Sequence, residues 1–134
     1  MTATPAKVTE KSAENDLVKM VIIDGIVHVH SKSDNQFTLE DAERMTNMRH
    51  QLQNYVKMPL LANLTGFRTW SKEAREFVST DYAVRYLSAE ALLTDNSLFT
   101  ITIANIYLKL SPPPIPHKVF NDREKAIQWL KKFI

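Results

Sequence analysis

The sequence predicts a single α/β domain, in which a mixed five-stranded sheet opens with an N-terminal hairpin and carries its helices mainly on one face. Three observations predict this fold. Residues 17–31 have the pattern of a β-hairpin, residues 58–64 and 89–95 are short apolar runs typical of buried strands, and amphipathic stretches with helical spacing lie between and after them. Strands that alternate with helices indicate a sheet with right-handed crossovers.

The hairpin is predicted by two β-rich runs on either side of Asp24-Gly25, a dipeptide that tolerates the positive φ angles of a two-residue type I′ turn. With that turn, Ile23 pairs with Ile26, and alternate side chains point to opposite faces. The side chains predicted to face the core are Val18, Met20, Ile22, Val27 and Val29.

The same register places His28 opposite Val21 and His30 opposite Lys19, on the wetter face of the hairpin. Two histidines separated by one residue can hold a metal ion, but no Cys, Asp or Glu with ligand spacing lies nearby. We therefore interpret both as partly exposed strand residues and predict no metal and no other cofactor.

The first long helix is predicted to begin at Thr38, a hydroxyl cap followed by Glu40 and Asp41, where the helix dipole favours negative charge. Apolar residues at spacings of three or four continue to about residue 56. They are Leu39, Ala42, Met45, Met48, Leu52, Tyr55 and Val56. The apolar run at 58–64, with Pro59 near its start, predicts a central strand covered on both faces.

Ser71 is predicted to cap a second helix with Glu73 in its first turn. The inward-facing residues of that helix are Ala74, Phe77 and Val78. A further helical piece is predicted at 81–87, and residues 89–95 form the next buried strand.

Residues 97–110 favour a strand by residue type and a helix by length, and we predict a helix. It carries two apolar stripes, more than one buried face needs, and such a surplus is typical of a partner surface. The residues predicted to form this interface are Phe99, Ile103, Ile106, Tyr107 and Leu110.

The C-terminal segment begins with three consecutive prolines within residues 111–116, which predict an extended connector, with a docking site for proline-reading modules as the less favoured alternative. A short strand is predicted at 117–120. Asn121 is predicted to cap the last helix, with Glu124 at the capping-box position. The residues predicted to pack inward from this helix are Ala126, Ile127, Leu130, Phe133 and Ile134.

Composition excludes several classes of protein. Residues 1–16 lack the apolar centre of a secretory signal and are predicted to form a disordered tail, so the domain spans 17–134 and a cytoplasmic location is expected. No apolar run approaches the ~20 residues that cross a bilayer. The 17 basic residues are scattered and nearly balanced by 15 acidic ones, so no nucleic-acid surface is expected. Gly25 and Gly66 are too far apart for a phosphate-binding loop. The sequence contains no cysteine, which excludes disulfides, thiol nucleophiles and thiolate-bound zinc.

The C-terminal third resembles a known family in four consecutive strings. They are NIYLKL (105–110), the proline-rich stretch (112–116), VFND (119–122) and AIQWL (126–130). Their order is similar to the N-x-aromatic, proline-rich, VF-x-D and A-x-x-WL pattern of the small bacterial SpoIIAA-like proteins. These proteins are a branch of the STAS superfamily that is also described as STAS/SEC14-like. The likeness covers about residues 17–134, and the hairpin and the strand at 89–95 support it less specifically.

The resemblance implies a sheet with helices largely on one side and a role through protein contact. In the anti-sigma-factor-antagonist members of the superfamily, a strand ending in Asp-Leu-Ser or Asp-Leu-Thr leads to a phosphorylated Ser or Thr at the next helix N-terminus. The matching residues here are Asn63, Thr65 and Ser71, so a regulatory or partner site is expected around them. Asn63 stands in place of the acid, and the string around Ser71 differs, so a plain helix cap is the other interpretation of Ser71.

The expected function is that of a non-catalytic regulatory or protein-interaction module, whose partner is another protein or a second copy of the chain in a homodimer. The alternative is a SEC14-like carrier of a lipid or small apolar ligand, which Phe99, Tyr107, Phe120 and Trp129 suggest. An enzyme is not expected, because the sequence contains no GxSxG, HExxH or similar catalytic string.

Overall fold

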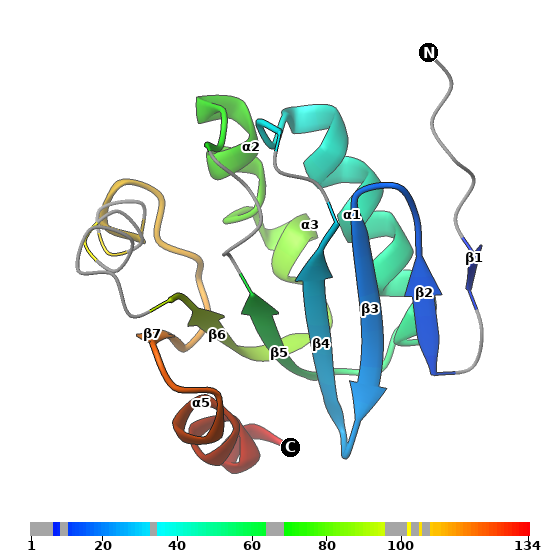
Figure 1. Ribbon diagram of the computed structural model, residues 1–134, viewed down its shortest axis with the longest axis vertical. Coiled ribbons are helices and arrows are strands. Elements are labelled where there is room, and N and C mark those ends of the chain that lie inside the picture. The colour runs from blue at the N-terminus through cyan, green and yellow to red at the C-terminus, as the bar shows by residue number, and fades with distance from the viewer. Residues whose placement is uncertain are drawn as a thin grey trace.

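The protein folds around one continuous β-sheet whose strands lie side by side in the order in which they occur along the chain (Figure 1). The computed structural model describes residues 7–8, 11–32, 35–63, 69–95, 102, 105 and 108–134. The strands within these residues are β1 (Lys7–Val8), β2 (Ser12–Glu14), β3 (Val18–Ile23), β4 (Ile26–Ser31), β5 (Met58–Asn63), β6 (Leu87–Leu93) and β7 (His117–Phe120). Strands β1 to β4 pair antiparallel and β4 to β7 pair parallel, so the sheet is mixed, as predicted.

Helices lie on both faces of this sheet. Because the parallel strands are added in one direction, the right-handed crossovers that join them lie on one side. That side carries α1 (Leu39–Leu52), α2 (Lys72–Phe77) and α3 (Asp81–Val84). The last helix, α5 (Arg123–Leu130), packs on the other side and continues into the 3₁₀ turn η1 (Lys131–Phe133) (Figure 1). The prediction of helices mainly on one face therefore holds for α1 to α3 but not for α5.

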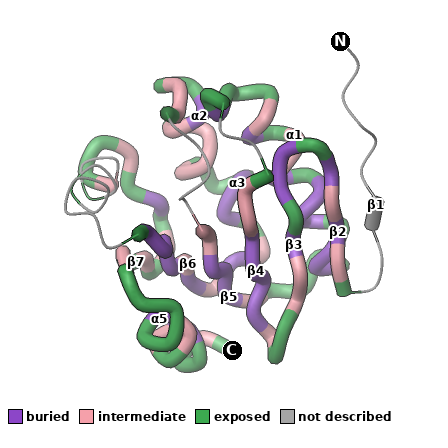
Figure 2. The backbone as a smooth tube through the Cα atoms, viewed as in Figure 1, coloured by how far each residue is buried: buried purple, intermediate pink, exposed green. Residues whose placement is uncertain are grey.

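The sheet divides the core into two parts. Leu60 and Leu61 are neighbours in β5, so their side chains point to opposite faces. Leu60 packs in a cluster with Met20 and with Met48 of α1, whereas Leu61 packs in a cluster with Leu130 of α5. Figure 2 shows that buried positions gather in the central strands β4 to β6. Full burial of a side chain of this size contributes roughly 1.5–3 kcal/mol.

The β3–β4 hairpin is the one predicted from the sequence. Ile23 pairs with Ile26, and Asp24 and Gly25 have φ angles of 50° and 79°, as a type I′ turn requires. The predicted core-facing side chains are buried or packed against the core, namely Val18, Met20, Ile22, Val27 and Val29. The turn dipeptide thus sets which face of the hairpin is apolar.

The predicted tail and the predicted number of strands need correction. Residues 11–16 are not a disordered tail, because β2 pairs with β3 and Ala13 is buried in the core. The Asn15 side-chain oxygen accepts hydrogen bonds from the backbone N–H groups of Leu17 at 2.8 Å and Val18 at 3.0 Å, which closes the turn between β2 and β3. With β1 and β2 included, the sheet formed by the described residues has seven strands rather than five.

Helix α1 begins where predicted but ends earlier. The Thr38 hydroxyl accepts a hydrogen bond from the backbone N–H of Asp41, and the Asp41 carboxylate accepts one from the backbone N–H of Thr38. The helix ends at Leu52, so Tyr55 and Val56 lie outside it and are 56% and 55% exposed. Their predicted place in the core is wrong, because the chain turns away through left-handed residues directly after the helix.

The last helix begins one residue later than predicted. Asp122, and not Asn121, is its cap, since the Asp122 carboxylate accepts a hydrogen bond from the backbone N–H of Lys125 at 3.1 Å. Both residue types are good caps, so the sequence does not separate them. Leu130 is buried as predicted, but Ile134 is exposed, because the chain leaves the helix through η1 before reaching it.

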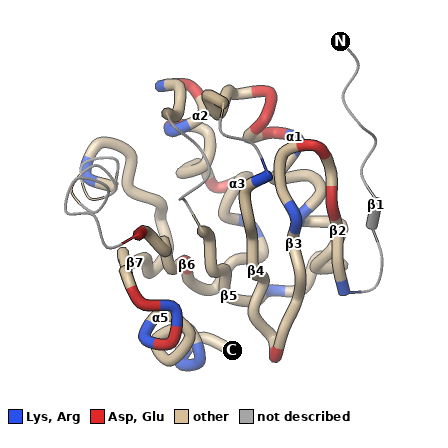
Figure 3. Tube along the Cα trace, in the orientation of Figure 1, with Lys and Arg blue, Asp and Glu red and all other residues tan. Residues whose placement is uncertain are grey.

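The predicted helix at 97–110 lies mostly outside the described residues. The residues of this segment that the structure describes are 102, 105 and 108–110, and they are helical. The helical piece predicted at 81–87 is α3 and ends at Val84, because β6 begins at Leu87. Figure 3 shows basic and acidic residues interspersed along the described chain. Among the helices in the described ranges, none combines the length and the apolar character that a membrane crossing requires.

Candidate functional site

The site predicted from the sequence lies where β5 ends and α2 begins. Asn63 is the last residue of β5, and Ser71 is the N-cap of α2. The Ser71 hydroxyl oxygen accepts a hydrogen bond from the backbone N–H of Ala74 at 3.0 Å, so it serves as a helix cap. Thr65 lies outside the described residues. The predicted role of these three residues in regulation therefore stays a prediction.

Backbone hydrogen bonds tie this corner to the start of α1. The N–H of Phe37 donates to the carbonyl of Thr69 at 2.8 Å, and the carbonyl of Phe37 accepts from the N–H of Ser71 at 2.9 Å. The buried Phe37 ring packs against Trp70, with ring centroids 4.7 Å apart. These contacts fix the position of the Trp70 side chain, which lines a pocket.

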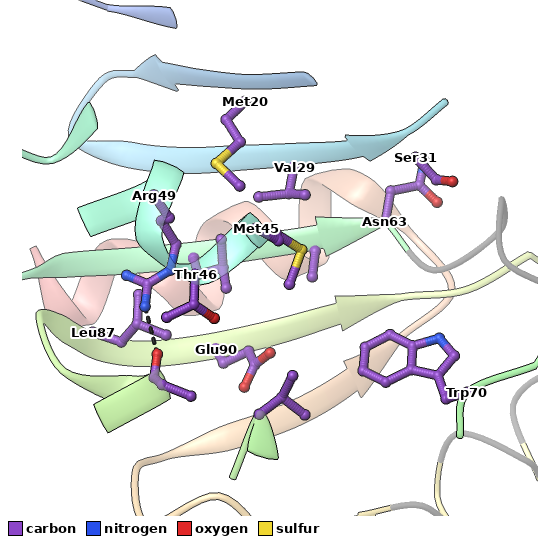
Figure 4. A pocket seen from close by; sticks show the side chains of 14 residues that line it. Met20, Val29, Ser31, Met45, Thr46, Arg49, Asn63, Trp70, Leu87 and Glu90 are labelled. Atoms are coloured by element: carbon purple, nitrogen blue, oxygen red, sulfur yellow. Dashed lines mark hydrogen bonds between the residues drawn. The ribbon is translucent and has the colours of Figure 1, made fainter. Parts of the chain in front are cut away.

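This pocket lies between the sheet and the helices α1, α2 and α3 (Figure 4). Its volume of about 50 Å³ leaves room for roughly four water-sized groups. The apolar part of its lining is Met20, Val29, Met45, Leu60, Ala62, Trp70, Val78, Ala83 and Leu87, and the polar part is Ser31, Thr46, Arg49, Asn63 and Glu90. Of the predicted site residues, Asn63 lines the pocket and Ser71 does not.

The guanidinium of Arg49 lies at one end of the pocket and makes three hydrogen bonds to the described residues. It donates to the side chain of Gln53, to the carbonyl of Ala83 at 2.5 Å and to the carbonyl of Arg85 at 3.4 Å. Burial lowers the pKa of Arg49 to about 10, with the charge of Glu90 acting in the opposite direction. Arg49 therefore stays charged at neutral pH and binds α1 to the chain segment around α3.

Glu90 projects from β6 into the same pocket. Burial raises the pKa of its carboxyl group, against the opposing effects of Arg49 and His117. Within the described ranges, no residue forms a hydrogen bond or ion pair with its carboxylate. Figure 4 shows Glu90 between Arg49 at one end of the pocket and Trp70 at the other. The pocket thus contains a carboxyl group that has no hydrogen-bond partner within the described ranges.

A second candidate site is exposed. Tyr55, Tyr82, Arg85 and Tyr86 form what we call the tyrosine surface. The ring centroids of Tyr55 and Tyr86 are 5.6 Å apart, and the guanidinium carbon of Arg85 lies 5.5 Å from the centre of the Tyr82 ring. The ring of His50 joins the two pairs from beneath, with centroids 5.1 Å from both Tyr82 and Tyr86. Tyr55 and Tyr82 are 56% and 41% exposed, so this is an aromatic patch accessible to a partner.

His50 itself is only 5% exposed, and its Nε2 atom has no hydrogen-bond partner in the part of the chain that the structure describes. Burial, followed by the charges of Arg49 and Arg85, lowers its pKa to about 4, although a hydrogen bond with the Tyr82 backbone opposes the change. The ring is therefore uncharged at pH 7, and it packs beneath the tyrosine surface.

The histidines of β4 differ in exposure. His28 is 5% exposed, so its predicted partial exposure is wrong: it lies on the face that α5 covers, and Arg123 Nη1 is 3.4 Å from its Nδ1. His30 is half-buried, as predicted. Burial, followed by the charge of Arg123, lowers the pKa of both rings. The described part of the chain contains no group of three His, Asp or Glu residues placed to hold a metal ion.

The interface predicted on residues 97–110 is described at one of its five residues. Phe99, Ile103, Ile106 and Tyr107 lie outside the described residues, and Leu110 is exposed. Single exposed leucines are common on protein surfaces, so Leu110 does not identify an interface by itself. The predicted interface stays a prediction.

Sequence reasoning missed the charged pocket and the tyrosine surface. Glu90 does carry a signal, because it is the one charged residue within the apolar strand Leu87–Leu93, where a charge needs a partner or a pocket. Arg49 carries no such signal, since an arginine on a helix is usually solvated. Tyr55 fits the apolar stripe of the helix, and that spacing predicts a position in the core.

Comparison with known proteins gives a family and a fold. The profile of the family described as Domain of unknown function (DUF7793) matches residues 20–134. The crystal structure of an uncharacterized protein from the DUF3478 family with a SpoIIAA-like fold, from Shewanella loihica PV-4, is similar over 97% of this chain and 98% of its own, with a TM-score of 0.55 and 17% sequence identity. A likeness at this identity establishes the fold, so the predicted SpoIIAA-like fold is confirmed. A search of curated protein sequences finds no match to this chain.

Proposed function

The chain belongs to the family described as Domain of unknown function (DUF7793), and from that premise we propose that it is a non-catalytic regulatory module of STAS-like type, which acts in the cytoplasm by binding a protein. Its partner is another protein or a second copy of the chain. The contact is made through the tyrosine surface. The observation that carries this proposal is the backbone conformation of two residues in that surface.

Tyr55 and Tyr86 adopt left-handed conformations, with φ angles of 60° and 69°. Such a conformation costs roughly 1–2 kcal/mol for a residue with a side chain, and glycine would remove most of that cost. Tyr55 gains little burial in return, because more than half of it is exposed. Strain held at an exposed aromatic residue supports a role in contact better than a role in stability.

The side chains of the tyrosine surface are of the types that dominate protein interfaces. Tyrosine and arginine are enriched among the residues that carry most of the binding energy, since they bury a large area and lose few rotamers. The stacking of Arg85 on Tyr82 restricts both side chains before any partner arrives. Val56, which follows Tyr55 and is also exposed, enlarges the apolar area beside them.

Ser71 is the proposed regulatory position of this module, and Asn63 and Thr65 belong to the segment that precedes it. The Ser71 hydroxyl accepts from the N–H of Ala74, so phosphorylation would place a dianion at the start of α2. Partner binding compared between Ser71→Asp and Ser71→Ala tests this role. Regulation requires the aspartate variant to change binding and the alanine variant to keep it. Equal binding by the two variants would contradict it.

A carrier of a lipid or small apolar ligand is the weaker candidate. Pockets that hold drug-sized ligands measure about 300–1,000 Å³, whereas the pocket between α1 and the sheet measures about 50 Å³. Native mass spectrometry of the purified protein tests this candidate directly. A lipid that co-purifies in stoichiometric amount would restore it.

Site-specific photo-crosslinking tests the proposed function. p-Benzoylphenylalanine replaces Tyr82 in one variant and Gln128, which is exposed on α5, in a matched control. After irradiation in cells, we expect a discrete adduct from position 82, identified by mass spectrometry as one protein or as a second copy of the chain. Adding Tyr55→Gly should remove this adduct and leave the fold intact. Equal crosslinking at both positions, or none at position 82, would refute the proposal.

A further inference from the structure

The carboxyl group of Glu90 in the pocket has no hydrogen-bond partner among the described residues. Glu90 lies in the middle of β6, and its carboxylate receives no hydrogen bond from the described residues. A carboxylate taken out of water costs several kcal/mol unless a hydrogen-bond donor or an opposite charge reaches it. The raised pKa of Glu90 reflects this cost. A bound group that carries donors would remove it.

The buried cation at the end of the pocket does not supply that donor. The guanidinium of Arg49 is directed to Gln53, Ala83 and Arg85, and no ion pair joins it to the half-buried Glu90. Arg49 therefore balances the charge of Glu90 only at a distance, and the space between Glu90 and Trp70 contains no cation from the described residues.

The remaining lining suits a small cation on an aliphatic stem. Trp70 lies at the other end of the pocket from Arg49, and an aromatic face attracts cations within about 6 Å. The thioethers of Met20 and Met45 are polarisable and adapt to the shape of a bound group. Asn63 and Ser31 lie beside each other and add polar groups to the lining.

We propose that the pocket binds one alkylammonium group, whose nitrogen donates to the Glu90 carboxylate and whose stem lies against Trp70 and the methionines. A pocket of about 50 Å³ admits an ammonium and roughly three methylene groups. Either a free small amine or the lysine side chain of a protein partner carries this group. The inference goes beyond the proposed function, because a free amine can occupy the pocket without any protein partner.

Water is the competing occupant, since the same volume holds about four water molecules. The two possibilities predict different affinities for added ligands. If the pocket only holds water, an ammonium ion and a neutral alcohol of the same length bind to it with equal affinity. If Glu90 selects an ammonium group, the charged ligand binds more tightly than the neutral one.

Titration by heteronuclear NMR of the full chain tests the proposal with n-propylamine as the probe and n-propanol as its neutral isostere. We expect n-propylammonium to shift the backbone amide signals of Ala62 and Glu90 and the indole signal of Trp70. Its dissociation constant should be at least about tenfold lower than that of n-propanol, which corresponds to about 1.4 kcal/mol. Equal affinities, or no shifts at these residues, would overturn the proposal.

Two variants locate the charge. Glu90→Gln keeps the shape of the side chain and should reduce n-propylammonium affinity to that of n-propanol. Glu43→Gln, on the exposed side of α1, is the matched control and should leave both affinities unchanged. Full ammonium affinity in Glu90→Gln would overturn the proposal. The native-protein comparison of amine and alcohol stands independently if Glu90→Gln unfolds.

Titration with Nα-acetyl-lysine amide distinguishes the two sources of the alkylammonium group, a free amine and a lysine side chain of a partner. Tighter binding of this compound than of n-propylamine supports a partner lysine, and weaker binding supports a free amine. The outcome is separable from the proposed function, because the titration requires no partner and the photo-crosslinking requires no amine. Failure of either experiment leaves the other intact.

Discussion

Acidification directly tests the burial of His50. The folded protein holds the pKa of this ring at about 4, against an ordinary value of 6.5, chiefly because burial disfavours the charged form. As the pH falls below 6.5, the unfolded chain binds a proton at His50 and the folded chain does not. The contribution of His50 to the free energy of unfolding is therefore lost between about pH 6.5 and about pH 4, and it changes no further below that window.

The magnitude follows from the difference of about 2.5 pH units between the unfolded and folded pKa values, which corresponds to at most about 3 kcal/mol. Tyr82, whose ring lies against His50, is partly exposed, so nearby water screens part of the effect. We therefore reduce the expected loss by about half, to about 1–2 kcal/mol.

Urea unfolding at about pH 7.5 and about pH 4.5 measures this loss, with His50→Asn as the reference. Asparagine keeps a donor for the Tyr82 backbone and cannot be protonated. The native protein should lose about 1–2 kcal/mol more than the variant between the two pH values. Glu90, whose raised pKa acts with the opposite sign, contributes equally to both proteins and cancels. The same pH dependence in both proteins would refute the account of His50.

Three further substitutions test the structure, each by urea unfolding at neutral pH. Ser71→Ala removes the cap bond to Ala74 and should cost about 1 kcal/mol, whereas Ser71→Asp should stay within a few tenths; equal costs would contradict the cap. Arg49→Ala leaves the carbonyls of Ala83 and Arg85 without this donor and should cost about 1–3 kcal/mol, so a loss under about 0.5 kcal/mol would contradict its role. Gly25→Ala forces a methyl-bearing residue into a φ of 79°, 3.4 Å from Ile134, and should cost about 1–2 kcal/mol, while Gly25→Asn should cost less; the reverse order would contradict the turn.

Much of the fold is readable from local signals. The Asp24-Gly25 turn and the alternation around it specify the hairpin, and the apolar runs specify the parallel strands. The strand β2 carries no such signal, since its three residues, Ser12–Glu14, include one apolar side chain. It forms because β3 offers an edge with which to pair, and that is a tertiary effect that no local pattern contains.

The sites are less readable than the fold. Asn63 was predicted near a site and does line the pocket, but the pocket itself is space that α1, α2 and α3 leave unfilled above the sheet. Residue spacing does not encode such space. The tyrosine surface depends on the left-handed turn after Leu52, without which Tyr55 would continue the apolar stripe of α1. Backbone conformation at two residues thus decided between core and surface.

The strands of the sheet follow one another in space as they do along the chain. Each newly synthesised strand can therefore pair with the strand made just before it, and no strand must wait for a later one to be inserted between its neighbours. No step closes a connection longer than the one between Ser31 and Met58, and loop-closure entropy grows only slowly with length, so no single step is especially costly. We expect the sheet to grow vectorially from its N-terminal side on the ribosome, with α5 the last helix to dock.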